Sequence, residues 1–380
     1  MTEKLYYIDA YIKEFTATVL SSEKVGEYYI VTLDKTAFFP EEGGQYADTG
    51  FIDGKRVVDV RLKDGEIYHK VDGELAIGRS VFCTIDFDSR YEKMQCHSAE
   101  HILSGLFSKY YGTRNVGFHL GSEDVTMDIS LPLDREDIFK IEQLANKIVA
   151  ENVDIISYFP TAAELSTLEY RSKMEIDGDV RIVKIGEYDT CACCAPHVSK
   201  TGEIGIIKIL DFEKLRGGMR IHITAGARAY KVVSLMHENL ARISRALSVP
   251  RLNTADAVDK TLSDLAEARF LYKQARESQF KMLAKYIEKT DKNSVLVYPD
   301  ATIDELRILA NEAGDSIGGY LVLLSGEENN YKYVIYSSKR GLKGEIKNIN
   351  ATLFGKGGGS DTMAMGSFLA TLSSIEEYFT

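Results

Sequence analysis

One long stretch of the chain, residues 231–290, favours helix throughout and separates the N-terminal part of the chain from the C-terminal part. From Ala255 to Leu283 it holds no glycine and no proline, and its apolar residues recur near helical spacing. At 380 residues the chain also exceeds what one hydrophobic core usually supports. We therefore predict at least two folded parts joined by a helical connector, 231–290, with an interaction surface on that helix as the alternative.

The first 88 residues carry the pattern of a small all-β domain. Runs rich in β-branched and aromatic residues at 28–33 and 56–62 are separated by turn signals such as Asp53-Gly54 and Asp64-Gly65. Short strands with such regular spacing are typical of a barrel or a sandwich. We predict a β-barrel domain over 1–88.

Residues 89–230 and 291–380 each mix helix with strand. Ser89 with Glu92 reads as a capping box, which predicts a helix from Tyr91 to Tyr111 that ends near Gly112. A second helix is expected at 135–152, and strands are expected at 154–159, 180–185, 204–211 and 219–223. The last ninety residues alternate strand and helix, as in a small α/β domain, and close on a glycine-rich run. The predicted class for the whole chain is α+β.

Composition narrows the class of protein. A hydrophobic fraction of 44% and a charged fraction of 27% are those of an ordinary globular protein, and no apolar run is long enough to span a membrane. The N-terminus lacks a secretory signal pattern, and five cysteines are an odd number for a disulfide framework. We expect a cytoplasmic protein with no membrane partner. The net charge of −11 excludes a uniformly basic nucleic-acid surface, although not a local patch.

Histidines and cysteines gather in two places with metal-ligand spacing. His97 and His101 lie four residues apart on the predicted helix, so both side chains leave from one face. Downstream, Cys193 and His197 repeat that spacing, next to Cys191 and Cys194. Zinc accepts imidazole and thiolate together. The two alternatives are structural histidines with buried thiols, and a zinc peptidase of the inverted His-x-x-Glu-His type in which Glu100 would be the base.

Several ordered motifs together resemble the free-standing alanyl-tRNA editing proteins in their long form, which are related to the editing and C-terminal parts of alanyl-tRNA synthetase. The matching pieces, in chain order, are Thr36 to Gln45 (family pattern T-x-F-x-P-x-G-G-G-Q), His97-x-x-x-His101, Cys193-x-x-x-His197, Thr201 to Gly205, Arg216-Gly217-Gly218-Met219-Arg220, Gly226-x-x-Ala229, and Gly357-Gly358-Gly359 with Asp361 and Ala364. The similarity covers nearly the whole chain.

The resemblance implies a zinc-binding editing domain over 89–230, with one zinc ion held by His97, His101, Cys193 and His197. This sequence departs from the family pattern at three places. Glu42 replaces the first of three glycines, Tyr46 stands where proline is usual, and the segment between Cys193 and His197 lacks the family's glycines. Cys191 or Cys194 therefore stays open as a substitute for Cys193.

By the same resemblance the protein is expected to hydrolyse the ester of tRNA for alanine that carries serine or glycine. A size-selective alanine pocket cannot exclude glycine and rejects serine weakly, so a second site must select for what alanine lacks. Candidate substrate or catalytic residues are Thr36, which would bind the serine hydroxyl, with Gln45, His119, Gly43 and Gly44. An inactive tRNA-binding protein is the alternative. The synthetase relationship also suggests nucleotide and ATP binding and a role in protein biosynthesis.

Two further regions are expected to contact tRNA. Gly217, Gly218 and Arg220 are candidates for binding the acceptor end, although an ordinary hairpin turn also explains them. Between Tyr331 and Lys347 five basic residues stand against one acidic residue, a local charge of +4. The tRNA-binding candidates in 291–380 are Lys339, Arg340, Lys343, Lys356, Gly357, Gly358 and Gly359. A solvated face is the alternative, and a homodimer through this domain is also open.

Overall fold

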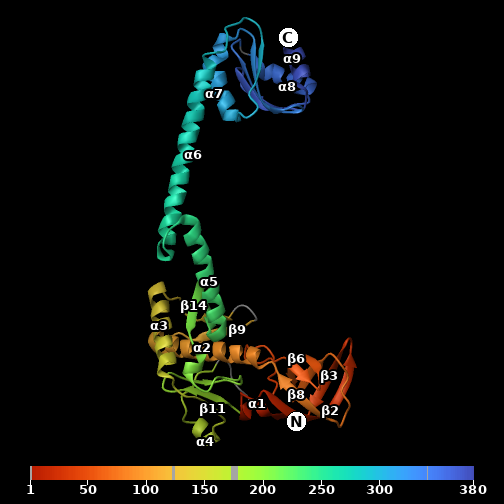
Figure 1. Cartoon of the computed structure of the whole chain (residues 1–380), viewed down its shortest axis with the longest axis vertical. Helices are drawn as coiled ribbons and strands as arrows, with labels where there is room; N and C mark the ends of the chain where they lie inside the picture. The colour runs from red at the N-terminus through yellow and green to blue at the C-terminus, as the bar shows by residue number, and fades with distance from the viewer. Residues whose placement is uncertain (1, 122–124, 173–178, 340) are drawn as a thin grey trace. The chain divides into compact units, whose positions relative to one another are not determined.

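The computed structural model describes residues 2–121, 125–172, 179–339 and 341–380 (Figure 1). The chain forms two compact units, Met1–Leu240 and Ala241–Thr380. Both mix helices with sheets, which confirms the α+β class. The finer division at 88, 230 and 290 stays a prediction. Among the described residues no helix is both long enough and apolar enough to cross a membrane.

The first unit holds the barrel and the candidate site. In chain order its elements are β1 (Glu3–Lys4), α1 (Leu5–Ile8), β2 (Glu14–Val25), β3 (Tyr28–Leu33), β4 (Lys35–Thr36), β5 (Gly50–Ile52), β6 (Lys55–Lys63), β7 (Glu66–Val71), β8 (Ser80–Ile85), α2 (Phe87–Tyr111), β9 (Asn115–Leu120), β10 (Val125–Ile129), α3 (Arg135–Glu151), β11 (Ile155–Tyr158), α4 (Ala162–Leu165), β12 (Ile182–Ile185), β13 (Asp189–Ala192), the 3₁₀ turn η1 (Thr201–Ile204), β14 (Ile207–Leu215), β15 (Gly218–Ala225) and α5 (Gly226–Leu247), which continues past Leu240.

Six strands of this unit close into a barrel in the order β2-β3-β7-β6-β5-β8, drawn in red and orange in Figure 1. Side chains along β7 alternate between half-buried and buried, as expected for a strand with one face on a core. At the two hairpins, Asp53-Gly54 and Asp64-Gly65 have positive φ at both positions, which type I′ turns require. Both Asp-Gly pairs therefore form the tight hairpin turns that the sequence predicts.

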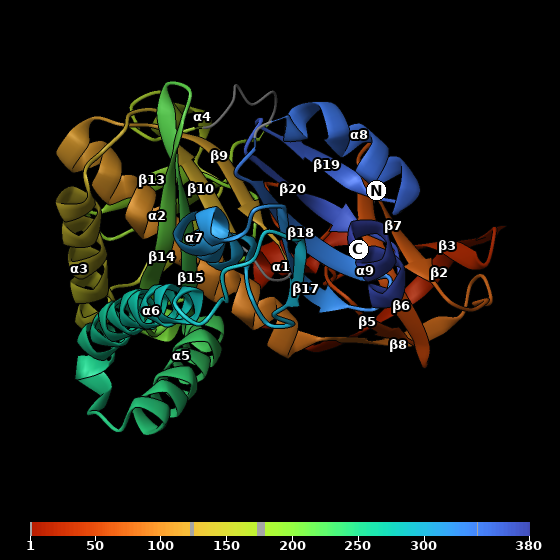
Figure 2. The same cartoon turned by 90° about the horizontal axis from the view of Figure 1, so that it is seen from above.

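Helix α2 is buried on every side. Every residue from Lys93 to Phe107 is buried, because the helix packs against both the four-stranded sheet β14-β15-β10-β9 and the three-stranded sheet β11-β12-β13. Figure 2 shows the four strands of the larger sheet side by side next to this helix. The predicted end is confirmed, since Gly112 has φ of 63° and its N–H donates to Ser108 O at 2.9 Å.

The predicted start of α2 is wrong by a few residues. Asp86 is the N-cap, and its carboxylate accepts a hydrogen bond from the Ser89 N–H at 3.3 Å. Ser89 thus lies inside the first turn, because an aspartate three residues upstream supplies the acceptor that this turn needs. The other expected elements of the unit lie close to their predicted ranges, except that 3₁₀ turn η1 occupies Thr201–Ile204, ahead of β14.

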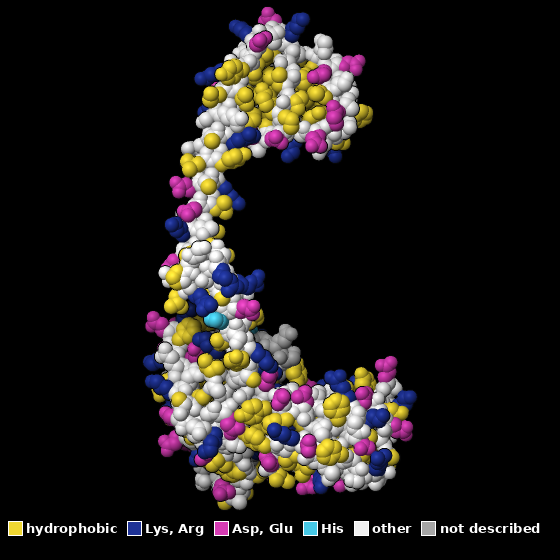
Figure 3. All heavy atoms as spheres, in the orientation of Figure 1, with side chains coloured by type: hydrophobic (Ala, Val, Ile, Leu, Met, Phe, Trp, Pro, Cys, Tyr) yellow, Lys and Arg dark blue, Asp and Glu magenta, His cyan; other side chains and the backbone are white. Residues whose placement is uncertain are grey.

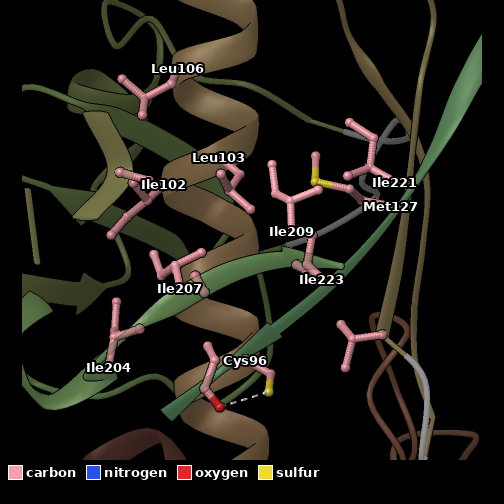
Figure 4. Packing of buried hydrophobic residues seen from close by; sticks show 14 of the residues in the cluster. Cys96, Ile102, Leu103, Leu106, Met127, Ile204, Ile207, Ile209, Ile221 and Ile223 are labelled. Atoms are coloured by element: carbon pink, nitrogen blue, oxygen red, sulfur yellow. Dashed lines mark hydrogen bonds between the residues drawn. The ribbon is translucent and has the colours of Figure 1, made fainter. Parts of the chain in front are cut away.

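Apolar packing holds α2 rigidly in place. Figure 4 shows Leu103 on α2 facing Ile209 and Met127 of the four-stranded sheet. All three residues are at most 3% exposed. Fully burying such a side chain contributes about 1.5–3 kcal/mol. At the other end of the picture the Cys96 thiol donates to Ala225 O at 3.8 Å. The helix that carries the candidate ligands is therefore fixed by the core of the unit.

The second unit is built around one mixed sheet. Its elements are η2 (Arg251–Asn253), α6 (Thr254–Ala284), β16 (Ser294–Val297), α7 (Ile303–Ala313), η3 (Gly314–Ser316), β17 (Tyr320–Glu327), β18 (Asn330–Ser337), α8 (Leu342–Thr352), β19 (Lys356–Gly359), β20 (Met363–Phe368) and α9 (Leu372–Phe379). The sheet order is β16-β17-β18-β20-β19. Within this sheet only β16 and β17 are parallel, and α7 connects them.

Helices cover both faces of this sheet. The end of α6, through Phe280 and Ala284, packs with α7 on one face, and α8 and α9 pack on the other. The rest of α6 is largely exposed, in keeping with a connector. The glycine-rich run forms edge strand β19, where a Cβ on Gly357 would lie 2.4 Å from the Tyr333 hydroxyl. Only glycine fits there, since real side chains do not approach so closely.

Candidate metal centre

Four side chains from two distant segments converge inside the first unit. Their ligand atoms, one each from His97, His101, Cys193 and His197, all lie within 4.8 Å of one another. Cys193 Sγ is 3.6 Å from His97 Nε2 and 3.4 Å from His197 Nε2. The three histidines are at most 4% exposed. The structure thus brings together the four residues expected to bind zinc, and leaves Cys194 outside this group.

The local folds of both segments explain the convergence. His97 and His101 lie one helical turn apart on α2, with ring centroids 5.4 Å apart. Cys193 and His197 lie in the loop after β13, which Arg181 anchors by donating to Cys193 O at 3.0 Å and Ala195 O at 2.9 Å. A helix from one part of the chain and an anchored loop from another therefore form opposite walls of the site.

Electrostatics favour the thiolate form of Cys193. Burial alone would raise the pKa of this thiol, but the imidazoles of His97, His101 and His197 hold it well below its usual range. A thiolate is the form that binds a metal ion. Burial also lowers the pKa of His197 and keeps its ring neutral. Imidazole and thiolate are the ligand types that zinc prefers, so the residues present fit that ion.

Each histidine is oriented by a hydrogen bond at Nδ1, 3.0 Å long in all three cases. His97 donates to Gln45 Oε1, His101 donates to Asp189 Oδ2, and His197 contacts Ser98 Oγ. Occupied Nδ1 atoms leave Nε2 as the ligand atom. Asp189 is in turn held by Arg171 through two hydrogen bonds of 2.7 and 2.8 Å.

We expect Asp189→Asn to weaken metal binding by about 10- to 100-fold, because the charged acceptor that orients His101 is lost. Competition with a chromogenic chelator measures this directly. Asp154→Asn is the matched control, since Asp154 is an exposed aspartate paired with Lys200 at 2.6 Å. Equal metal affinity in the two variants would contradict a role for Asp189 in orienting the ligand.

Sequence reasoning missed these outer partners. Asp189 and Arg171 lie in no recognised motif, and Asp189 is 88 residues from His101 in sequence. Ser98 sits inside the histidine motif, but nothing in its position there distinguishes it. Asp189 also forms a second possible ligand group with His101 and Cys191. That group shares His101 with the first, so it belongs to the same site.

The loop expected to approach a ligand lies directly against this cluster. Glu42 and Gln45 exchange two backbone hydrogen bonds of 3.0 and 3.2 Å that close a tight turn. Gly43 and Gly44 both have positive φ, and a Cβ on Gly44 would lie 2.7 Å from Phe118 O. Gln45 is fully buried, and its side chain binds a ligand histidine. Glycine is required at this turn both for its backbone angles and for its close packing.

Thr36 lies in the barrel core with local partners. It is fully buried, its hydroxyl accepts from the Phe38 N–H at 3.1 Å, and it is 2.9 Å from His69 Nε2. His69 Nδ1 donates to Val31 O at 3.1 Å, so Nε2 must accept from Thr36. A serine hydroxyl would have to compete with these bonds. The role of Thr36 in recognising serine stays a prediction.

The buried His69 makes the barrel sensitive to acid. Burial lowers the pKa of His69 from its ordinary 6.5 to about 4, although its hydrogen bond to Val31 O opposes this. The unfolded chain therefore binds more protons than the folded chain between these pH values, and stability falls as pH drops from about 6.5 to about 4. We expect a loss of about 3 kcal/mol over this range.

Urea unfolding at pH 7 and pH 4 tests this expectation on wild type and on His69→Gln. The variant has no group at this position that titrates, so its free energy of unfolding should fall by about 3 kcal/mol less between the two pH values. An equal fall in both proteins would show that His69 does not titrate in this way.

The other candidate residues of this unit lie away from the four ligands. The Phe118 ring on β9 packs against the His97 ring with the centroids 4.8 Å apart. Strand alternation directs His119 to the opposite side, where it is exposed and 3.4 Å from the Tyr46 hydroxyl. Arg220 forms two hydrogen bonds of 2.8 and 2.9 Å to Asp128 within the sheet. A Cβ on Gly218 would lie 2.2 Å from Ile129 O, so its packing already explains the glycine.

Glu100, the base of the peptidase alternative, lies beside the ligand His101. Its carboxylate accepts from the Ser104 hydroxyl at 2.5 Å and from the Asn115 side chain. The residue is 1% exposed. These two bonds use Oε1, and the other oxygen, Oε2, lies 4.0 Å from His101 Nε2. The peptidase alternative therefore stays an alternative on the geometry of Glu100 alone.

The fold and this buried centre are those of a protein that shares parts with class II tRNA synthetases. Residues 180–222 match the family described as the second additional domain of threonyl and alanyl tRNA synthetase, and residues 3–89 match the family of class II (A) tRNA synthetases. The first match contains Cys193 and His197 as well as Asp189.

Comparison with individual relatives identifies the family within this class of proteins. An alanyl-tRNA editing protein AlaX-L of Pyrococcus horikoshii is 30% identical over 96% of this chain and 94% of its own length. AlaX-M of Methanosarcina mazei is 39% identical over 57% of this chain. An alanine–tRNA ligase of Ignicoccus hospitalis is 33% identical, and the alignment spans 33% of the ligase. The chain belongs to the alanyl-tRNA editing protein family.

Proposed function

We propose that this protein is a zinc-dependent hydrolase that removes serine or glycine from wrongly charged tRNA for alanine, acting on tRNA that a separate enzyme has charged. The observation that supports this most strongly is the buried set of three imidazoles and one thiolate, in a family of alanyl-tRNA editing proteins. Neither the comparisons nor the described residues support nucleotide or ATP binding, so these do not enter the proposal.

The residues have distinct tasks under this proposal. His97, His101, Cys193 and His197 would hold one zinc ion, which supplies a Lewis acid beside the ester or orders the substrate. Gln45, Asp189 and Ser98 keep the imidazoles aimed at the ion through their Nδ1 bonds. Burial of the site excludes bulk water and strengthens every electrostatic contact inside it. The turn at Gly43 and Gly44 lets backbone approach the substrate closely.

Binding of tRNA is proposed for the second unit, on a smaller set of residues than the charge count suggested. Lys332 on β18, Ser367 on β20 and Lys356 on β19 pair directly across three strands, so their side chains share one face. This is the face that α7 covers in part, because Val334 two residues along β18 packs with α7. The local charge and the open backbone at Gly358 would suit tRNA phosphates.

The remaining basic candidates do not join this face. Lys343 lies on α8, which packs on the opposite side of the sheet, and Lys339 follows β18 in an exposed turn. Arg340 lies outside the described residues. Figure 3 also shows hydrophobic side chains gathered over one face of this unit. A homodimer through this unit stays a prediction.

The function is tested by deacylation of purified tRNA for alanine charged with serine, glycine or alanine, with metal content assayed in the same samples. We expect serine or glycine to be released with alanine spared. A protein that binds zinc and tRNA but cleaves none of the three esters would be a binding protein instead, and the proposal would be wrong.

A further inference from the structure

Buried polar atoms without partners mark a second recognition point beside the metal centre. Tyr6 Oη, Glu42 Oε2 and Gln45 Nε2 are buried and find no hydrogen-bond partner within the described part of the chain. Tyr6 is 1% exposed and Gln45 is fully buried. Leaving such an atom unpaired is unfavourable, and more so for a charged group. A cost of this kind at a candidate active site points to a ligand that supplies the missing partner.

These atoms lie where a substrate on the metal centre would reach them. Glu42 begins the turn that ends at Gln45, whose amide oxygen orients His97. Between them, a Cβ on Gly43 would lie 3.1 Å from Cys194 Sγ, next to the ligand Cys193. The turn that holds Glu42 is thus in contact with both walls of the metal site.

Tyr6 belongs to the same cluster. Its ring packs edge-on against Phe39, at 5.4 Å, in the segment that leads to Glu42. Burial is the main cause that raises the pKa of the Tyr6 hydroxyl, and the charges of Tyr7 and Glu42 raise it further. The hydroxyl therefore stays protonated and can donate or accept a hydrogen bond.

The neighbouring Glu41 has a cationic partner, whereas Glu42 has none among the described residues. The Glu41 carboxylate forms an ion pair with Arg61 and is 33% exposed. Glu42 forms no salt bridge with any described residue, and the buried cation Arg181 donates to the carbonyls of the ligand loop. Glu42 is half-buried, and its Oε2 atom is fully buried. A carboxylate oxygen in this position without a countercharge is best relieved by a cation that carries N–H donors.

We propose that Glu42 binds the α-ammonium group of the aminoacyl ester, with the Tyr6 hydroxyl as a second partner. This rests on the proposed function, because that substrate carries one cation, and it is attached to the carbon next to the ester. The phosphates are anionic and are repelled by a carboxylate. A ribose hydroxyl can donate to a carboxylate, but it would give no preference between two ligands that carry the same ribose. The family pattern has glycine at this position, and the contact is therefore a feature of chains that carry an acid there.

The test measures binding of two stable analogues to the full-length protein with its metal. One is the 3′-amide of 3′-amino-3′-deoxyadenosine with serine, and the other is the amide with glyceric acid, in which a hydroxyl replaces the amine. Titration calorimetry at pH 6.5 keeps the amine charged, since α-amino groups titrate at about 7.7. We expect wild type to prefer the serine analogue by about 10- to 100-fold.

Glu42→Gln and Glu42→Gly should bring this preference close to one, with metal content and melting temperature unchanged. Tyr6→Phe should reduce it less, and Glu41→Gln, the same change one residue earlier, should keep it. An unchanged preference in both Glu42 variants would overturn the inference. The deacylation assay with serine and alanine esters adds a further outcome. If the Glu42 variants change only the preference for serine over alanine in that assay, Glu42 binds the side-chain hydroxyl and the inference is wrong.

The experiments can disprove the proposed function and the inference about Glu42 independently of each other. If wild type prefers the amine-bearing analogue through Glu42 but cleaves no ester, the inference holds and the proposed function is wrong. If wild type cleaves the ester and the Glu42 variants keep the amine preference, the function holds and the inference is wrong.

Discussion

Cys193→Ala is expected to lower metal affinity by more than about 100-fold and to abolish deacylation, while tRNA binding is retained. Loss of an outer partner alone costs about 10- to 100-fold in metal affinity, and a direct ligand should cost more. Cys193 is the only thiolate donor in the four-residue group found among the described residues. Metal content by mass spectrometry, single-turnover deacylation and tRNA filter binding measure the three effects.

Cys83→Ala and Cys194→Ala are the matched controls for this result. Cys83 is buried in the barrel core, away from the ligands, and Cys194 is the neighbour that could replace Cys193. Both controls should keep a full complement of metal. Retained metal in Cys193→Ala with loss in Cys194→Ala would reassign the ligand. Loss of tRNA binding together with metal would mean that the second unit does not supply most of the affinity for tRNA.

Arg90→Met should destabilise the first unit by about 3–5 kcal/mol, which corresponds to a fall in melting temperature of about 6–20 °C. The Arg90 side chain is fully buried and pairs with the equally buried Asp48, with Nε 3.0 Å from Oδ2. It also donates to the carbonyls of Ala10, Ile12 and Ala37. Removal of the cation leaves the buried Asp48 charge with only the Phe39 N–H at 2.7 Å and Lys93 Nζ at 3.9 Å. Thermal unfolding by circular dichroism measures the change.

Arg79→Met is the surface control, since the Arg79–Asp53 pair is 3.4 Å long and its arginine is 65% exposed. Exposed pairs contribute about 0–1 kcal/mol, so this variant should melt close to wild type. Adding Asp48→Asn to Arg90→Met should recover part of the loss. A melting temperature for Arg90→Met equal to that of Arg79→Met would contradict the account of a buried pair that ties α2 to the barrel.

Local signals predicted most of the secondary structure in the first unit. The Asp-Gly pairs predicted the hairpins because only a few residues tolerate positive φ at both turn positions. Gly112 predicted the end of α2 for the same reason. The start of α2 was missed because two polar residues, Asp86 and Ser89, could each cap it, and the choice depends on backbone angles that sequence does not report.

The sequence by itself determined the α+β class, the family and the residue types that a zinc site needs, because turn chemistry, motif order and four-residue spacing are local properties of the chain. Only the tertiary structure decided which groups surround those ligands. Asp189 reaches His101 across 88 residues, Thr36 turns inward to His69, and Lys356 and Lys343 separate onto opposite sides of one sheet. Packing determines such contacts, since burial removes water as a partner and each polar group must then find one in the fold or, like Glu42, in a ligand.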